Sequence, residues 1–234
     1  MNLSATQSRR FIRIIDGARL KRVTEKPEDT IKGSVQLIEK EVGVRPGFLE
    51  SLREEDDWSF VIKSHALLEA AVSNLICKTV GRDELAEVFS HVELSGKQAG
   101  KMAFVKALDL LDEPDRRFIN SLSELRNQLV HNVANVDFDL KQHTSAMPLK
   151  ELDSFAKKFN SFSEGEIVDY RGENLPPKEV FRRDPKTAIW WSVTVTVAII
   201  YQVRKIEHFK KEAEHLSFIN NTLSRLLPEA SEQP

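Results

Sequence analysis

Residues 112–131 read DEPDRRFINSLSELRNQLVH, and this stretch decides the fold because it joins a helix start to a long apolar stripe. Acidic residues and Pro114 occupy the first turn, as is typical of a helix N-terminus. Apolar residues then recur every three or four positions, which is the period of an amphipathic helix. They are Phe118, Leu122, Leu125 and Leu129. We therefore expect a helix that buries this stripe and ends close to His131.

The last turns of this predicted helix carry side chains suited to phosphodiester cleavage. Arg126 is followed directly by Asn127, and His131 lies four residues beyond the Asn. At 100° per residue, Asn127 and His131 are about 40° apart, so the amide can hydrogen-bond the imidazole and select its tautomer. RNA cleavage through the ribose 2′-hydroxyl needs a proton acceptor, which suits His131. It also needs a cation that offsets charge on the phosphate oxygens, which suits Arg126.

The same residues have a purely structural interpretation. His131 and Asn132 could simply end the helix, with the imidazolium near the C-terminal dipole and Asn132 in the left-handed cap conformation. Arg126 would then pair with an exposed carboxylate. Short motifs match by chance often enough that both interpretations stay open at this point.

A second long helix is predicted upstream and could face the motif helix. Its apolar stripe also contains a histidine, for which a place in the core is expected. The stripe consists of Trp58, Val61, Ile62, His65, Leu68, Val72 and Leu75. Small residues at Ala66, Ala70 and Ala71 would allow close approach of a neighbouring helix. Residues 96–111 are expected to form a further helical stretch between the two.

On Arg126, Asn127 and His131 the chain resembles the HEPN superfamily, whose hallmark is an Arg, a polar residue that is often Asn, and a His four to six positions further on. The resemblance implies an all-α HEPN-like helical bundle acting on RNA as a metal-independent endoribonuclease. It also implies a homodimer with a composite site, 2′,3′-cyclic phosphate products and no cofactor. Glu69 is similar to the acidic residue that often accompanies the motif; alternatively it is a rim carboxylate or pairs with a nearby Lys. An antitoxin-neutralised toxin or a phage-defence effector would be a setting for such an enzyme.

The chain is also similar in plan to the mannitol operon repressor (MtlR) family. Ser59–Ile62 leading into Ala66–Ala71, the motif helix and a late apolar helix carry this resemblance, and the two resemblances together cover roughly residues 56–225. It implies a non-catalytic transcriptional regulator or interaction module that works through a protein partner. The sequence shows no helix-turn-helix with a basic recognition helix, so direct base readout is not expected.

The N-terminal region predicts an appendage to the bundle. Residues 1–26 carry seven basic and two acidic residues, a local net charge of +5, which suits contact with phosphate or, alternatively, a solvated surface helix. The candidate nucleic-acid contacts are Arg9, Arg10, Arg13, Arg19, Lys21 and Arg22. A short amphipathic helix at 27–44 and a break at 43–46 follow. We therefore expect a basic arm and short helix at 1–45, the bundle at 46–227 and a disordered tail at 228–234.

The rest of the chain predicts connections and two more helices. Residues 133–148 are expected to be irregular, 149–162 a short helix and 163–184 a long loop. Asp184 and Pro185 predict a helix start, and Thr187–Val203 a buried helix, with a membrane anchor or a strand as alternatives. Residues 205–216 are expected to extend that helix into solvent, with charge pairs four residues apart.

Several chemistries are not expected. The single cysteine, Cys77, falls in an apolar helix and predicts a buried thiol. The six histidines show no zinc spacing, and the sequence contains neither a Gly-rich phosphate loop nor a Gly-x-Ser-x-Gly elbow. With a net charge of -2 there is no bulk attraction to nucleic acid, and one cysteine suits a reducing cytoplasm.

Overall fold

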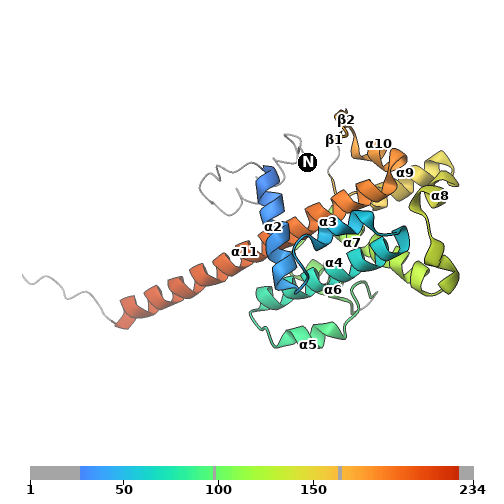
Figure 1. Ribbon diagram of the computed structural model, residues 1–234. Coiled ribbons are helices and arrows are strands. Elements are labelled where there is room, and N and C mark those ends of the chain that lie inside the picture. Colours follow the sequence, from blue (N-terminus) through green and yellow to red (C-terminus); the bar gives the residue numbers. More distant parts are fainter. Residues whose placement is uncertain (1–26, 97–98, 163–164, 227–234) are drawn as a thin grey trace, which may run out of the picture.

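The computed structural model describes residues 27–96, 99–162 and 165–226 of the chain (Figure 1). Within these ranges the fold is all-α, with a single two-stranded antiparallel hairpin, so the predicted all-α class is confirmed. The predicted basic arm, with Arg9, Arg10, Arg13, Arg19, Lys21 and Arg22, and the polar tail from residue 228 lie outside the described residues.

Helices dominate every described part of the chain. The first half contains α2 (Pro27–Glu41), α3 (Phe48–Ser51), η1 (Leu52–Glu54), α4 (Asp57–Val80), α5 (Leu85–Ser90) and α6 (Lys101–Ala107). The second half contains α7 (Glu113–Val130), η2 (Val133–Asp137), α8 (Leu140–Ser145), α9 (Leu149–Lys158), β1 (Val168–Tyr170), β2 (Glu173–Leu175), α10 (Pro177–Arg183) and α11 (Pro185–Leu226). The last helix is the longest described, at 42 residues.

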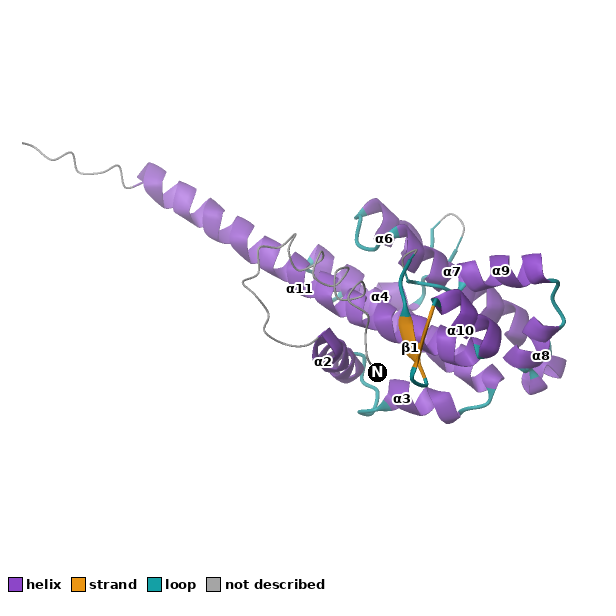
Figure 2. Ribbon diagram, turned by 90° about the horizontal axis from the view of Figure 1, so that it is seen from above, coloured by secondary structure: helices purple, strands orange, loops and turns teal. Residues whose placement is uncertain are grey.

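The core forms where the first half of α11 packs against α4 and α2 (Figures 1 and 2). Residues 188–201 of α11 are all buried. The Trp190 indole donates a hydrogen bond to the Leu49 carbonyl at 2.8 Å, and Gln202 donates to the Ser34 hydroxyl at 2.7 Å. The predicted buried helix over Thr187–Val203 is confirmed, and the alternative of a strand is wrong.

Part of the predicted N-terminal appendage shares this core. Ile38 of α2 is fully buried within the same hydrophobic cluster as the apolar residues of α4 and α11. The buried Glu39 carboxylate accepts hydrogen bonds from the backbone N–H groups of Gly47 and Leu49, at 2.9 and 2.8 Å. These two bonds hold the turn that follows the predicted break. Gly47 lies in this turn with a φ of 74°, a backbone conformation that favours glycine.

Helix α4 is bounded by clear capping residues. Its N-cap, Asp56, accepts a hydrogen bond from the backbone N–H of Ser59 at 2.8 Å, and its C-cap, Gly81, lies in the left-handed region with φ 77°. Cys77 is buried, as predicted. Among the described helices, α4 is the one long and apolar enough to cross a membrane, and 61% of its most apolar window is buried inside the fold.

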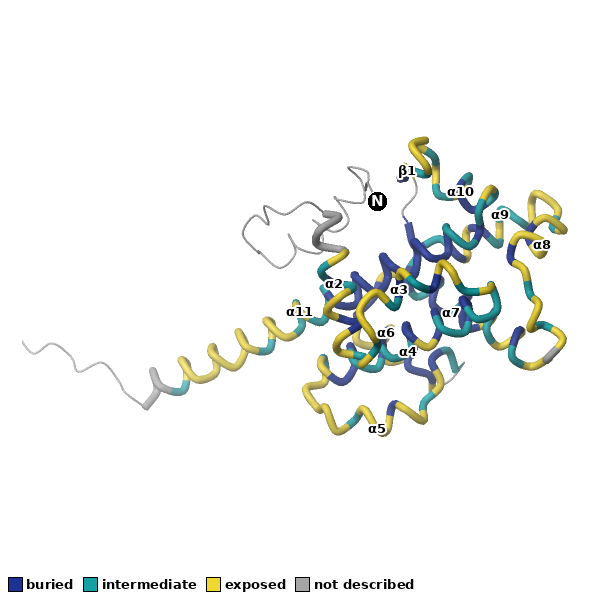
Figure 3. The backbone as a smooth tube through the Cα atoms, viewed as in Figure 1, coloured by how far each residue is buried: buried dark blue, intermediate teal, exposed yellow. Residues whose placement is uncertain are grey.

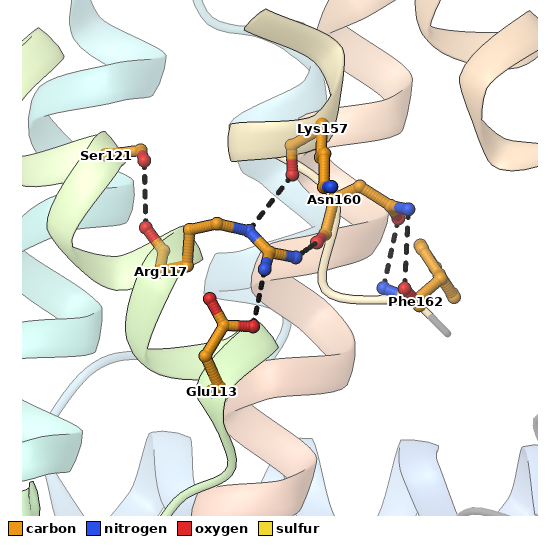
Figure 4. A network of polar contacts seen from close by, with 6 residues as sticks. All are labelled: Glu113, Arg117, Ser121, Lys157, Asn160 and Phe162. Atoms are coloured by element: carbon orange, nitrogen blue, oxygen red, sulfur yellow. Dashed lines mark hydrogen bonds and ion pairs between the residues drawn. The ribbon is translucent and has the colours of Figure 1, made fainter. Parts of the chain in front are cut away.

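Helix α7 runs from Glu113 to Val130, close to the predicted bounds, and packs against α4. Its first turns are tied to the end of α9 by Arg117 (Figure 4). The Arg117 guanidinium donates to the carbonyl oxygens of Lys157 and Asn160, at 3.2 and 3.4 Å, and pairs with Glu113 at 2.5 Å. A cation placed on the free carbonyls of a helix C-terminus stabilises that end, so Arg117 sets how α7 and α9 meet.

Two predicted connections are more structured than expected, and one predicted helical stretch is shorter. The range 133–148 contains η2 and α8, and the described part of 163–184 contains the β1–β2 hairpin and α10, so both predictions of irregular chain are wrong. The predicted helical stretch at 96–111 is shorter, since α6 covers Lys101–Ala107 only. The hairpin turns through Arg171 and Gly172, with φ of 56° and 86°, a two-residue turn that matches the twist of its strands.

The second half of α11 leaves the body of the molecule (Figure 3). Residues 212–221 are all exposed. The predicted solvated extension is confirmed, but its described ion pairs are not the expected pairs of Glu207 with Lys211 and of Lys210 with Glu214. The described pairs join Lys210 to Glu207 at 2.7 Å and His208 to Glu212 at 3.4 Å.

Candidate functional site

The motif lies at the C-terminal end of α7, as the sequence predicts. Arg126 is half-buried, whereas Asn127 and His131 are exposed. The Arg126 guanidinium donates to the Asn127 carboxamide oxygen at 3.0 Å. Among the described residues, the Asn127 side chain makes this bond and no hydrogen bond to His131. The expected bond between Asn127 and His131 is therefore not formed. The amide holds the guanidinium instead of orienting the imidazole.

His131 is the C-cap of α7. Its backbone N–H donates to the Asn127 carbonyl at 3.3 Å, and its side chain is exposed. The cap prediction is right for His131 and wrong for Asn132, which has an extended backbone with φ −139° and begins η2, where its side chain accepts from the Ala134 N–H. Asn135 donates to the Gln128 carbonyl at 2.9 Å and so satisfies one of the free carbonyls at the end of α7.

A buried polar cluster lies between α4 and α6, close to Arg126. The Lys101 side chain is 2% exposed, and its ammonium pairs with the Glu69 carboxylate at 2.7 Å. The other oxygen of Glu69 lies 3.9 Å from Nδ1 of His65. The sequence interpretation that paired Glu69 with a nearby Lys is therefore the arrangement found. Glu69 and Lys101 also line a groove of about 510 Å³ that continues along α4 past Cys77.

His65 links this cluster to the motif. It is buried in the core, as predicted. Burial lowers the pKa of its imidazole below the usual 6.5; Glu69 opposes this shift, and the positive charges of Arg126 and Lys101 add to it. His65 is therefore neutral at pH 7 and lies within the electrostatic influence of the motif arginine.

The relative placement of Arg126 and His131 follows from helix geometry. Five residues at 100° each put them about 140° apart around α7 and roughly 7.5 Å apart along it. Arg126 thus lies toward α4 and the Glu69 cluster, while His131 is at the exposed tip of the helix. A phosphate held by Arg126 would meet a second imidazole more readily if another motif helix lay across from it.

Some residues near the motif were not predicted as part of a site. Lys101 was missed because a lone Lys in a short amphipathic helix carries no sign that its ammonium is buried. His65 was predicted as a core residue, and only the structure links it to Glu69, by distance, and to Arg126, by charge. Among the described residues no group of three or more His, Cys, Asp or Glu side chains could hold a metal ion.

Comparison of the chain with protein-family models, with curated proteins and with solved structures found no match. A function is therefore inferred from the positions of Arg126, Asn127 and His131.

Proposed function

We propose that the protein is a HEPN-like, RNA-directed endoribonuclease that cleaves without a metal ion, through Arg126, Asn127 and His131 in a site built from two copies of the chain. One observation carries this proposal. Three side chains suited to phosphodiester cleavage are grouped at one helix end, and both Asn127 and His131 are exposed to a substrate. The cytoplasm, where RNA is abundant and a single cysteine stays reduced, is the proposed location.

The chemistry would be an internal transesterification. His131 of one protomer accepts the proton of the ribose 2′-hydroxyl as its oxygen bonds to phosphorus. The bond from phosphorus to the 5′-oxygen breaks, and a protonated His131 from the second protomer gives its proton to that oxygen. Arg126 offsets the charge on the non-bridging oxygens, and Asn127 holds the guanidinium in place. The products are a 2′,3′-cyclic phosphate and a 5′-hydroxyl.

The cluster behind the motif supports this arrangement without taking part in bond making. Glu69 is engaged by Lys101 and belongs to the same cluster as His65, which lies within the electrostatic influence of Arg126. Neutral His65 adds no further positive charge there. The charges of this cluster are therefore nearly balanced, and we expect the charge of Arg126 to act on a bound phosphate.

The test is cleavage of a mixed RNA substrate in excess EDTA by wild type, His131→Ala and Arg126→Ala. His91→Ala and Arg82→Ala are matched controls, because both residues are exposed and lie away from the motif near α5. We expect wild type and both controls to leave cyclic phosphate ends, and the motif variants to lose at least roughly 100-fold in rate. Equal cleavage by all five proteins would point to a contaminating nuclease and contradict the proposal.

A non-catalytic role is the second candidate, favoured by a specific observation. The projecting half of α11 exposes Phe209, Leu216, Phe218 and Ile219, which is typical of an interaction module, as the MtlR-like interpretation implies. Such a module would act through a protein partner, for example a regulator or an antitoxin. No cleavage by folded dimers of the wild type would favour this role and leave the motif with a structural one.

A further inference from the structure

The projecting half of α11 carries a second pattern that is independent of RNA cleavage. From residue 206 onward, apolar and small residues alternate at spacings of three and four, which is the heptad repeat of a coiled coil. The a positions are Ile206, Ala213 and Asn220, and the d positions are Phe209, Leu216 and Leu223. Phe209 is 48% exposed and Leu216 65% exposed, although both belong to this stripe.

The described body of the protein leaves most of this stripe exposed. Lys211 still contacts the body, since its ammonium donates to the Lys78 carbonyl at 3.4 Å. Beyond it, residues 212–221 are all exposed, and the helix runs on away from the body (Figure 3). An exposed apolar stripe on a projecting helix indicates a surface that another helix covers.

We propose that this half of α11 pairs with the same half of a second copy of the chain, as a parallel, in-register, two-stranded coiled coil. Asn220 identifies the partner. A single Asn at an a position specifies register and favours two strands, because it lies opposite an identical Asn. In this pairing the bulky Phe209 layer is also followed by the small Ala213 layer, which gives large side chains room to interdigitate.

The direction of pairing follows from the same residues. In an antiparallel pair a positions meet d positions, and matching Ile206 with Leu223 sets Asn220 opposite Phe209. The amide would then be buried against an aromatic ring, which costs free energy because its hydrogen bonds are lost. The parallel pair avoids this cost. It also places both bodies at the same end of the coil.

The charged residues beside the stripe oppose the parallel pair only weakly. Lys205 of one chain and Lys210 of the other occupy the g and e positions that approach each other across such an interface, so they repel as like charges, and both are exposed to screening by solvent. Each is held within its own chain, because Lys210 pairs with Glu207 at 2.7 Å and the Lys205 ammonium lies 5.9 Å from the Tyr201 ring centroid. The projecting half of α11 does not have to nucleate a helix of its own, because it continues the helix that the buried half already forms.

The first experiment measures the mass of the full chain in solution by sedimentation equilibrium. Wild type is expected at twice the chain mass of 26.7 kDa. Leu216→Glu should weaken the dimer by roughly 100-fold or more, because two carboxylates would enter an apolar seam. Phe218→Glu is the matched control: Phe218 is 69% exposed but lies at an f position, away from the seam, so this variant should stay dimeric.

A second experiment tests register and direction. Phe209→Cys is oxidised and compared with wild type, whose Cys77 is buried. In the parallel pair the two introduced thiols face each other and a covalent dimer forms. In an antiparallel pair they would lie roughly 16 Å apart along the axis and would not join. A monomeric wild type, an equal effect of the Leu216 and Phe218 variants, or a dimer without the disulfide would each overturn the proposal.

Discussion

At the residue scale, His65 makes stability depend on pH. Its folded pKa lies below the unfolded value of 6.5, so as pH falls through that value the unfolded chain takes up a proton that the folded chain does not. The free energy of unfolding should therefore fall below about pH 6.5, by at most about 1.4 kcal/mol per pH unit from this group. Urea unfolding at pH 7 and pH 5.5 should show a smaller loss for His65→Gln than for wild type. The exposed His91→Gln should behave like wild type.

The pair of Glu69 and Lys101 gives a second prediction at this scale. Lys101 is buried and Glu69 is half-buried, so removing the carboxylate strands the buried ammonium, and Glu69→Ala should lower the free energy of unfolding by about 3 kcal/mol. Adding Lys101→Met removes the stranded ammonium and should recover most of that loss. A double-mutant cycle by urea denaturation measures the coupling. If the two losses simply add, the pair does not couple these helices.

The motif shows how far residue-level prediction reaches. The helical period placed Arg126, Asn127 and His131 correctly at the end of α7. The partner of Asn127 was not predictable from spacing, because a neighbouring guanidinium and an imidazole one turn on are both within reach of the amide. Glu69 and Lys101 are 32 residues apart in sequence. The helical period does not predict which lysine comes close to Glu69 in the folded chain.

At the scale of elements, a glycine at a helix end and a glycine inside a helix should respond in opposite directions to the same change. Gly81 has φ 77° at the end of α4, so Gly81→Ala forces a strained left-handed backbone and should cost about 1 kcal/mol. Gly33 lies inside α2, where an added Cβ meets nothing within 4 Å. Gly33→Ala should stabilise by about 0.5–1 kcal/mol. Thermal unfolding followed by circular dichroism compares them, and equal shifts would contradict the prediction.

The long helices were predictable and the short elements were not, for a physical reason. Helices α4 and α7 bury a stripe over many turns, and α11 buries a long continuous run of residues, so each pattern rises above chance. The β1–β2 hairpin and α8 depend instead on tertiary contacts, such as the edge-to-face packing of Tyr170 on Trp191 and the bond from the Leu140 N–H to Asp57. Helix α10 did leave a signal, since Pro177 begins it and Glu179 lies in its first turn.

At the scale of the whole molecule, a site shared by two copies predicts how mixed dimers behave. If each cleavage needs His131 from both protomers, a dimer with one His131→Ala chain is inactive. An equal mixture of wild type and His131→Ala, after subunit exchange, should then retain about a quarter of the activity of the same total amount of wild type. Retention of about half would mean that each protomer carries its own complete site. The activity of the mixture and of wild type is measured as the initial rate of RNA cleavage.

The continuity of α11 has a mechanical consequence. Its buried half is held by α4 and α2, and its free half continues the same rod for roughly 22 residues, about 33 Å at 1.5 Å per residue. A tilt of the held half by about 10° would swing the far tip by roughly 6 Å. The helix therefore acts as a lever with its fulcrum in the hydrophobic core, and force applied at the tip is felt beside the helix that faces the motif.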